Sequence, residues 1–293
     1  MKSLSWNGFS TQFVVLIAVG FSVMSSPRLS AAMVGSVFVS GHDSDFHAAL
    51  GPSPAAAQHI IQDALTFARN GNTAPILYIE SDLSNLSLGD HTDSEPGLIA
   101  SGYTAGTTVG NHYVKVNSTV FATLNLSLYS ALFIPSDHGG TLTGNDLQAL
   151  DARSTDILAY INAGGGLVAF SEDGNHRQPT SGPAPALFGF LPFLVSSTAF
   201  SEAESGNTLT AEGISLGLST SDINGNFSHN VFTATGGMNV VDRDRAGDIL
   251  SLDFRGQISS TGVGVPEPST GLLIGISVAV FLIVRRLRNG QSI

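Results

Sequence analysis

The sequence predicts an α/β fold with three layers and a mostly parallel sheet. Short apolar runs typical of buried strands, "VGSVFVS" at 34–40 and "PILYIE" at 75–80, are separated by a segment with helical periodicity. The same alternation recurs in the centre of the chain. Strands that alternate with helices form βαβ units, and these units place their strands parallel in one sheet.

The segment between the first two strands predicts a helix over 54–70 that is closed by Gly71. Its apolar residues recur at the spacing of one helix face: Ile60, Ile61, Ala64, Leu65 and Ala68. Residues 81–112 are rich in Ser, Gly, Asp and Thr, and they predict a long loop with one short helix around "PGLIASGY". Loops of that length often line functional sites.

The central unit begins with "YSALFIPSDHGG", which predicts a strand that runs into a glycine turn. "TGNDLQALDARSTDILAYINAGGG" then predicts a helix, with Thr143 and Asp146 in the pattern of a capping box. "LVAFSEDG" is the next strand and turn. After Pro179 the pattern becomes irregular, with shorter strand-like pieces such as "MNVVD" and "ILSLDF".

Both ends of the chain indicate export. Residues 1–32 have the order of a signal peptide, with an apolar core at 13–23 and small residues at 30–32, although a permanent N-terminal anchor has the same general form. The 14 uncharged residues 271–284 are a short membrane span, since about 20 are needed to cross the hydrocarbon. The arginines after them favour the cytoplasmic side: Arg285, Arg286 and Arg288.

The sequence therefore divides into four parts. We expect a signal peptide at 1–32, an α/β domain at 33–260, a linker at 261–268 and a transmembrane helix with a basic tail at 269–293. The domain and linker hold all 23 acidic residues and only seven basic ones, which gives a formal charge near −16. Nucleic acid is excluded as a partner for such a surface, whereas an extracellular polysaccharide remains open. The chain has no cysteine, which excludes thiol catalysis and zinc-thiolate sites.

The tail resembles the PEP-CTERM sorting signal of bacterial envelope proteins. The three features of that signal occur in order, namely Pro266-Glu267-Pro268, a short apolar helix and an arginine cluster. The resemblance implies that the membrane enzyme exosortase cuts near the Pro-Glu-Pro and passes the protein to the cell surface or an extracellular matrix. An anchor that is never cleaved is the alternative.

The body resembles the class I glutamine amidotransferase-like superfamily, and its ThuA-like branch in particular. The stretch "ALFIPSDHGGTLTGNDLQAL...ILAYINAGGGLVAFSEDG" carries this resemblance, which covers about 34–175. It implies a flavodoxin-like sandwich, with the reactive residue on a sharp elbow that falls at Ser171. Amidotransferases use a Cys-His pair, and this chain has no cysteine. Glutamine hydrolysis is therefore not expected.

Polar clusters follow three predicted strands, at the edge where ligands bind in doubly wound sheets. These clusters are "GHDSDFH", "PSDHGG" and "SEDGNH". Imidazoles and carboxylates together are ligands of divalent transition metals and also act as acid-base pairs. The candidate ligands for a substrate or a divalent metal are His42, Asp43, Asp45, His47 and His138. The candidate catalytic residues are Ser171, Glu172, His138, Asp137 and His229.

Each of these residues also has a structural interpretation, because Asp and His side chains at strand ends cap helices and close turns. Ser171 lacks the flanking glycines of a hydrolase elbow. The acidic loop at 89–97 offers Asp90, Asp93 and Glu95 to calcium, but it lacks the spacing and length of an EF-hand, so a solvated loop is the preferred interpretation.

Two functions follow from these observations. The first is a ligand-binding surface protein that is sorted by exosortase, and the second is a hydrolase with a His/Asp/Glu site and a possible divalent metal. Convergence of the strand-end side chains on one point favours the hydrolase, whereas scattered side chains that cap turns favour the binding protein. A structural matrix protein with a degenerate pocket is a third interpretation.

Overall fold

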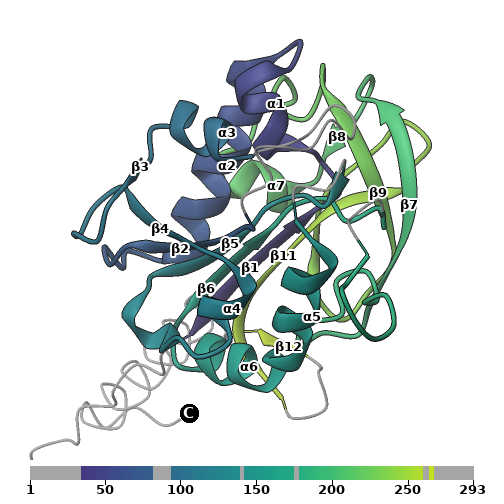
Figure 1. Cartoon of the computed structure of the whole chain (residues 1–293). Helices are drawn as coiled ribbons and strands as arrows, with labels where there is room; N and C mark the ends of the chain where they lie inside the picture. The colour runs from purple at the N-terminus through teal and green to yellow at the C-terminus, as the bar shows by residue number, and fades with distance from the viewer. Residues whose placement is uncertain (1–33, 82–93, 139–141, 175–177, 260–263, 267–293) are drawn as a thin grey trace, which may run out of the picture. The chain divides into compact units, whose positions relative to one another are not determined.

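The computed structural model describes residues 34–81, 94–138, 142–174, 178–259 and 264–266 (Figure 1). The predicted signal peptide at 1–32 and the predicted membrane helix at 269–293 lie outside these residues. So do Glu267 and Pro268 of the sorting motif and Asp90 and Asp93 of the acidic loop. Among the described residues, no helix has the length and apolar character to cross a membrane.

One sheet of 12 strands runs through the body. Its main path has the order β3-β4-β2-β5-β6-β1-β11-β10-β8; β9 and β12 also pair with β11, and β7 pairs with β9. Neighbouring strands are parallel from β3 to β1, and β11 begins an antiparallel region. The strands are β1 (Gly35–Ser40), β2 (Ile76–Ile79), β3 (Thr104–Ala105), β4 (His112–Val116), β5 (Ala131–Ile134), β6 (Gly166–Ala169), β7 (Val195–Ala203), β8 (Thr208–Leu209), β9 (Phe227–Thr235), β10 (Asn239–Arg243), β11 (Ile249–Ile258) and β12 (Gly264–Pro266).

The central strands β1, β2, β5 and β6 are buried along their whole length. Their side chains alternate between two hydrophobic clusters, so Val37 and Val39 join one cluster while Phe38 joins the other. Strands that are covered on both faces need apolar residues at every position rather than at every second one. This requirement explains the continuous apolar runs in the sequence.

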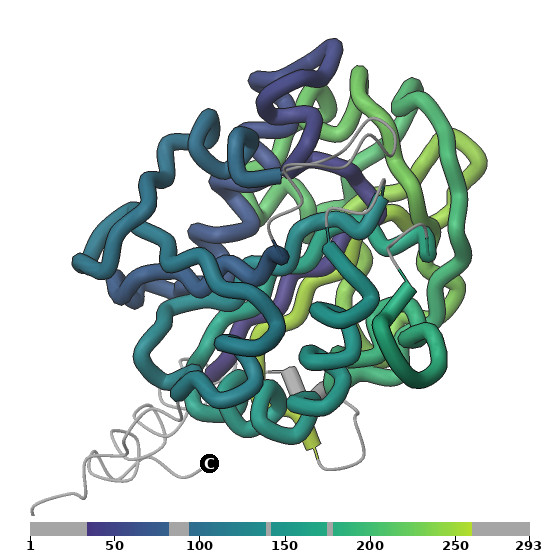
Figure 2. Tube along the Cα trace, in the orientation of Figure 1, coloured from purple at the N-terminus to yellow at the C-terminus, as the bar shows by residue number. Residues whose placement is uncertain are grey.

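Helices cover both faces of the sheet (Figures 1 and 2). α2 packs its predicted stripe, including Ile61 and Leu65, into the cluster that contains Phe38, whereas α5 and α6 supply Leu147, Leu150 and Ile157 to the other cluster. The helices are α1 (Ser44–Leu50), α2 (Pro54–Arg69), α3 (Glu95–Ala100), α4 (Ser118–Phe121), the 3-10 turn η1 (Leu126–Leu128), α5 (Gly144–Ala152), α6 (Ser154–Asn162) and α7 (Ala211–Ser215). The α/β class is confirmed, and the body has the three expected layers.

The central helix of the sequence analysis is divided into two. Thr143 and Asp146 form the expected capping box at the start of α5, but the helix stops at Arg153, and α6 begins at the next residue. The Arg153 guanidinium donates from Nη1 to the carbonyl of Phe121 at 2.6 Å. This contact ties the break between the two helices to the end of α4.

The strand order differs from that of a flavodoxin-like sheet. In that order the first strand lies between the second and third strands of the parallel core. Here β2 pairs directly with β5, and β1 lies between β6 and β11. Hydrophobic pattern identifies strands but carries no information on which strands are neighbours, so the sequence could not predict this arrangement.

The region after Pro179 contains more strand than its pattern suggests. β7 and β9 pair antiparallel over most of their length, and β9 also touches β11. The residues of β7 are all half-buried or exposed, and its sequence "VSSTAFSEA" is largely polar. A strand of that composition lacks the apolar signal that identified β1 and β2.

The first and last described strands, β1 and β12, flank β11 at one end of the sheet. Gly35, at the start of β1, pairs with Gly256 of β11, and Gly256 also pairs with Pro266 of β12. This end holds the amino termini of the parallel strands. The polar clusters that follow β1, β5 and β6 lie at the opposite end.

Gly166 marks a place where the helix layer approaches the sheet too closely for any side chain. An added Cβ would lie 2.2 Å from the carbonyl oxygen of Ala68 in α2. We expect Gly166→Ala to lower the free energy of unfolding by about 3 kcal/mol, because the backbone must shift. Gly71→Ala has open space around its Cβ and a φ of +80°, so it should cost only ~1 kcal/mol of backbone strain. Urea unfolding compares the two, and equal effects would contradict the steric explanation.

Candidate functional site

The chain segments after three parallel strands meet at the carboxyl edge of the sheet. β1 leads into His42 and Asp43, β5 leads into Asp137 and His138, and β6 leads into Ser171 and the residues after it. β9 lies across the first of these segments, because the N–H of His229 donates to Gly41 O at 2.7 Å. Pairing of a distant strand therefore places His229 beside the end of β1.

His42 is a structural residue in this arrangement. The imidazole is buried, with Nδ1 2.5 Å from Glu204 Oε1 and Nε2 2.7 Å from Asp242 Oδ2. Burial alone would lower the pKa of His42, but the charges of the two carboxylates outweigh it and raise the pKa to about 10. Both ring nitrogens are occupied by carboxylates, which leaves neither of them for a metal or a substrate.

Asp45 holds the turn after β5 in place. Its Oδ2 accepts from the backbone N–H of Ser136 at 2.9 Å, and Ser136 Oγ donates to Asp43 Oδ1 at 2.8 Å. Burial, followed by the neighbouring charge of Asp43, raises the pKa of Asp45 to about 7. Two buried carboxylates thus share one serine, and Asp45 serves the backbone rather than the open side of the site.

Asp137 and Glu172 are also used internally. Asp137 accepts from the backbone N–H groups of Asp173 and Gly174 at 2.7 and 3.1 Å, so it closes the turn after β6. Glu172 Oε2 accepts from the N–H of Phe188 at 2.5 Å. Burial and then the charge of Asp137 raise the pKa of Glu172 well above its ordinary value. These two predicted catalytic residues therefore shape the loop that carries Asp173.

Five other side chains converge, and we refer to them as the His–Asp cluster: Asp43, His47, His138, Asp173 and His229. They form two groups of three that share His229, and within each group one nitrogen or oxygen atom per residue lies within 4.8 Å of the others. Asp43, His47 and His229 make the inner group, in which no side chain is more than 7% exposed. His138, Asp173 and His229 make the outer group, in which His138 is 24% exposed.

Asp43 is the centre of the inner group. Its Oδ2 lies 3.4 Å from His229 Nε2 and 3.8 Å from His47 Nε2. The ring of His47 stacks on Phe227, with ring centroids 5.6 Å apart, which fixes the direction of its imidazole. Two ligands of a tetrahedral zinc ion, each about 2.1 Å from the metal, are about 3.4 Å apart. The inner group thus has nearly the spacing of a metal site.

The outer group covers the inner one. The rings of His138 and His229 stack with centroids 3.7 Å apart and planes 7° from parallel. His138 Nδ1 also pairs with Asp173 Oδ2. Burial lowers the pKa of His138, but the hydrogen bond and charge of Asp173, with the charges of Asp43 and Asp137, raise it overall. The partly exposed, oriented imidazole of His138 therefore lies between His229 and solvent.

Ser171 does not have the contacts of an activated nucleophile. Its side chain is fully buried, and its Oγ has no hydrogen-bond partner among the described residues. A catalytic Ser171 would need a nearby base such as His138 or His229, and no contact with either supports that role, so it stays a prediction. Glu95 of the predicted calcium loop begins α3 and pairs with Lys115 at 3.0 Å and with the Tyr113 hydroxyl at 2.5 Å.

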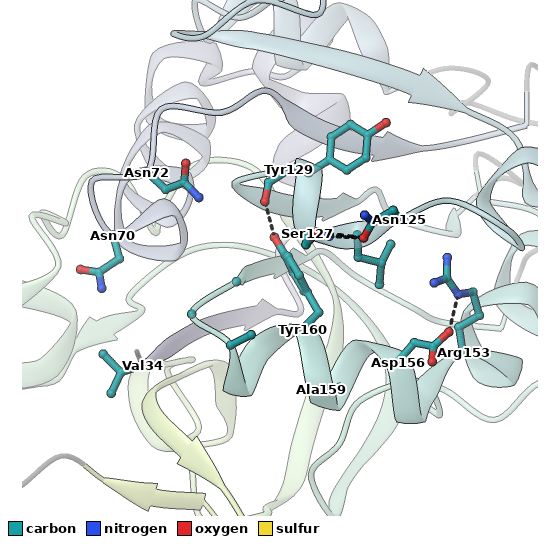
Figure 3. A pocket seen from close by; sticks show the side chains of 14 residues that line it. Val34, Asn70, Asn72, Asn125, Ser127, Tyr129, Arg153, Asp156, Ala159 and Tyr160 are labelled. Atoms are coloured by element: carbon teal, nitrogen blue, oxygen red, sulfur yellow. Dashed lines mark hydrogen bonds and ion pairs between the residues drawn. The ribbon is translucent and has the colours of Figure 1, made fainter. Parts of the chain in front are cut away.

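A wide hollow of about 790 Å³ lies away from this chemistry, at the amino ends of the strands (Figure 3). Tyr160 donates to the carbonyl of Tyr129 at 3.2 Å there, and Arg153 pairs with Asp156 at 2.9 Å. Its lining contains no member of the His–Asp cluster. The size of a cavity therefore does not locate the candidate site in this protein, whereas the side-chain chemistry does.

The sequence identified the members of the His–Asp cluster, but it did not distinguish them from candidates that have structural roles, such as His42 and Asp45. Asp43, His47, His138 and His229 were all candidates, and Asp173 stood in a candidate segment. Glu204 and Asp242, the partners of His42, were missed, because they are 162 and 200 residues away in the chain.

Comparison with protein-family models, with curated proteins and with solved structures found no match to this chain.

The pair of carboxylates around His42 predicts a specific stability profile. His42→Ala should lower the free energy of unfolding by about 3–5 kcal/mol, because it leaves buried carboxylates without their cation. The folded pKa of about 10 exceeds the ordinary value of 6.5. The contribution of the native pair is therefore complete below pH ~6.5 and is lost as the pH rises towards 10.

Urea unfolding over that pH range measures both effects. His42→Gln removes the titrating group but keeps a hydrogen-bonding side chain, so its stability should fall less steeply with rising pH than that of the native protein. His112→Gln, at a half-buried position in β4, is the control. Parallel pH profiles for the native protein and His42→Gln would contradict the assignment.

Proposed function

We propose that the body of this protein binds a divalent transition metal ion through Asp43, His47 and His229 and uses it for hydrolysis. The observation that carries the proposal is the convergence of these three side chains, with ligand atoms 3.4 and 3.8 Å apart, beneath the stacked His138. Two imidazoles and one carboxylate are a common ligand set for catalytic zinc.

Among the described residues the inner group offers three ligands, and this number favours a catalytic metal over a structural one. Structural zinc sites use four protein ligands, whereas catalytic sites use three and leave a position for water. A metal ion lowers the pKa of that water and polarises the bond that is cut. In hydrolysis the water oxygen bonds to the carbonyl carbon or phosphorus, the bond to the leaving group breaks, and a proton from the water passes to the leaving group.

The residues around the inner group have separate parts in this proposal. Phe227 and Asp43 orient His47, and the backbone bond to Gly41 holds His229 in place. His138 and Asp173 lie on the solvent side, where a substrate enters. A binding protein without catalysis was the first function that the sequence predicted. Internal use of His42, Asp45, Asp137 and Glu172 agrees with that function.

We also infer that the chain is exported and sorted to the cell envelope through a PEP-CTERM tail cut by exosortase. Support comes from the sequence: an apolar core at 13–23, Pro266-Glu267-Pro268, and the short apolar run followed by arginines. The acidity of the body suits a soluble domain outside the cell. The tail would contact the membrane, and an extracellular polysaccharide is a further proposed partner of the mature protein.

The metal proposal predicts a specific loss of binding. Calorimetric titration of the native protein with Zn²⁺ should show one site per chain, and His47→Ala and His229→Ala should each weaken it by at least about a hundredfold while the protein stays folded. His59→Ala is the matched control, because that histidine is 60% exposed and lies outside the cluster. Absence of a site in the native protein, or equal binding by all variants, would refute the metal centre.

Turnover separates a hydrolase from a metal-binding protein. The metal-loaded protein should cleave activated ester or phosphoester substrates, and a chelator should abolish this activity. Stoichiometric zinc with no turnover on either substrate class would favour the binding protein over the hydrolase.

The sorting proposal makes a prediction about mass. Replacing Pro266, Glu267 and Pro268 by alanine should leave the folded body unchanged but retain the C-terminal tail, because the processing enzyme no longer recognises it. Intact mass of the protein recovered from the envelope is the measurement. A mature mass and location equal to those of the native protein would contradict sorting by this motif.

A further inference from the structure

The wide hollow at the amino ends of the parallel strands has a lining without net charge (Figure 3). Among the described residues that line it, Arg153 is the only cation and Asp156 the only anion, and their Nε and Oδ2 atoms pair at 2.9 Å. Arg153 is held further by Phe121, whose carbonyl accepts from Nη1 and whose ring lies 5.0 Å from the guanidinium. The hollow therefore offers hydrogen bonds to a ligand but no unbalanced charge.

Asparagine side chains supply amide groups to this hollow, and local turns fix the direction of two of them. Asn72 Oδ1 accepts from the backbone N–H of Ala74 at 3.0 Å, and Asn125 Oδ1 accepts from the N–H of Ser127 at 3.1 Å. Both side chains are exposed, and in the part of the chain that the structure describes their Nδ2 groups have no acceptor. Each amide therefore presents an oriented donor to water or to a ligand.

Apolar groups lie among these polar ones. Val34, Ala159 and Ala163 line the hollow together with the ring of Tyr160. The hydroxyl of Tyr160 donates to the carbonyl of Tyr129, and a Cβ on Gly165 would lie only 2.3 Å from the ring. Contacts at its edge and at its hydroxyl thus fix this ring, so the hollow combines a rigid apolar surface with hydrogen-bonding groups around it.

The polar groups form two sets with Tyr160 between them. Figure 3 shows Asn70 and Asn72 on one side of the ring, and Asn125, Arg153 and Asp156 on the other. A ligand that meets both sets must be elongated and must repeat its hydrogen-bonding groups along its length. The volume of about 790 Å³ is within the range of small-ligand sites, about 300–1,000 Å³.

We propose that this hollow binds a short segment of a neutral polysaccharide. Each sugar unit carries hydroxyl groups, which both donate and accept, around a ring whose C–H groups are apolar. The amides of Asn72 and Asn125 donate to hydroxyl oxygens, and Asp156, whose side chain is 61% exposed, accepts from hydroxyl groups. The C–H groups pack against Ala159 and Tyr160.

The lining argues against other occupants. A small ion would find no unbalanced charge, and an anionic polymer is repelled by a body with a formal charge near −16. An apolar chain would remove the amides from water without giving them partners. An extended peptide binds by adding a strand to a free sheet edge, but β1, which begins beside Val34, already has β6 on one side and β11 on the other.

This site needs neither the metal centre nor the sorting tail. It gives the proposed polysaccharide partner a neutral chemistry and a place on the body. Binding is measured on the purified protein with oligosaccharides, whereas the metal centre is tested with Zn²⁺ and the tail by mass. Failure of one proposal is therefore distinguishable from failure of the others.

The test titrates the full-length protein by calorimetry with four neutral probes: cellotetraose, maltotetraose, mannotetraose and N-acetylated chitotetraose. We expect at least one to bind with a Kd below about 1 mM, and the anionic probe tetragalacturonate to bind at least about tenfold more weakly. Asn72→Asp and Asn125→Asp keep the oxygen that closes each turn but lose the amide donor, so each should weaken binding by about twofold to tenfold. Asn145→Asp is the matched control, because Asn145 Oδ1 accepts from the N–H of Thr180 outside the hollow.

A bulky side chain tests the position of the site without removing a hydrogen bond. Ala159→Phe, at an exposed position of α6, should weaken binding at least about tenfold, because the ring occupies the space of the ligand. Ala152→Phe, at an exposed position of α5 outside the lining, should leave binding unchanged. Circular dichroism checks that each variant is folded. Failure of all four neutral probes to bind, undiminished binding by Ala159→Phe, or a preference for tetragalacturonate would overturn the proposal.

Discussion

The buried ion pairs of His42 are the interaction on which the candidate site depends. His42 lies just beyond β1, in the parallel part of the sheet, while Glu204 follows β7 and Asp242 lies in β10, in the antiparallel part. One imidazolium therefore joins the two parts at the edge where the polar loops gather. Because the charges are paired on both sides of the ring, the group remains charged in a place from which water is excluded.

The position of His229 follows from this junction. β9 crosses the end of β1 so closely that a Cβ on Gly41 would lie 2.1 Å from the carbonyl oxygen of Asn230. The bridge between His42 and Ser228 continues the same contact. Asp43 then faces His229 across the junction, and neither residue could meet the other if the antiparallel strands were displaced. The metal-like spacing of Asp43 and His229 thus results from long-range strand pairing. The local sequence supplies only the residue types.

This dependence explains what could be predicted from the sequence. β1, β2, β5, β6 and α2 have strong local signals, namely continuous apolar runs and an apolar helix stripe, and the structure confirms them. The neighbours of β1 depend on pairing across more than a hundred residues, and β7 depends on pairing with β9, from Ala203↔Phe227 to Val195↔Thr235. Neither kind of pairing leaves a local pattern. The same limit applies to the histidines. His42 and His47 are only five residues apart and chemically identical. His42 is nevertheless enclosed by distant carboxylates, whereas His47 belongs to the His–Asp cluster.

Pairing at the other end of the sheet places the last described residues of the chain opposite the His–Asp cluster. Gly35 and Pro266 flank Gly256 at the amino ends of the parallel strands, and a six-residue strand such as β1 separates that end from His42 by about 20 Å. Attachment to a surface through the chain beyond Pro266 would therefore hold the His–Asp cluster at the far pole, turned outward. Molecules fixed to the same surface would be out of its reach. If the proposed metal centre and surface attachment both hold, the centre would act on molecules that diffuse past or on a polymer that faces the surface, and the distance of the cluster from the surface would set that selectivity.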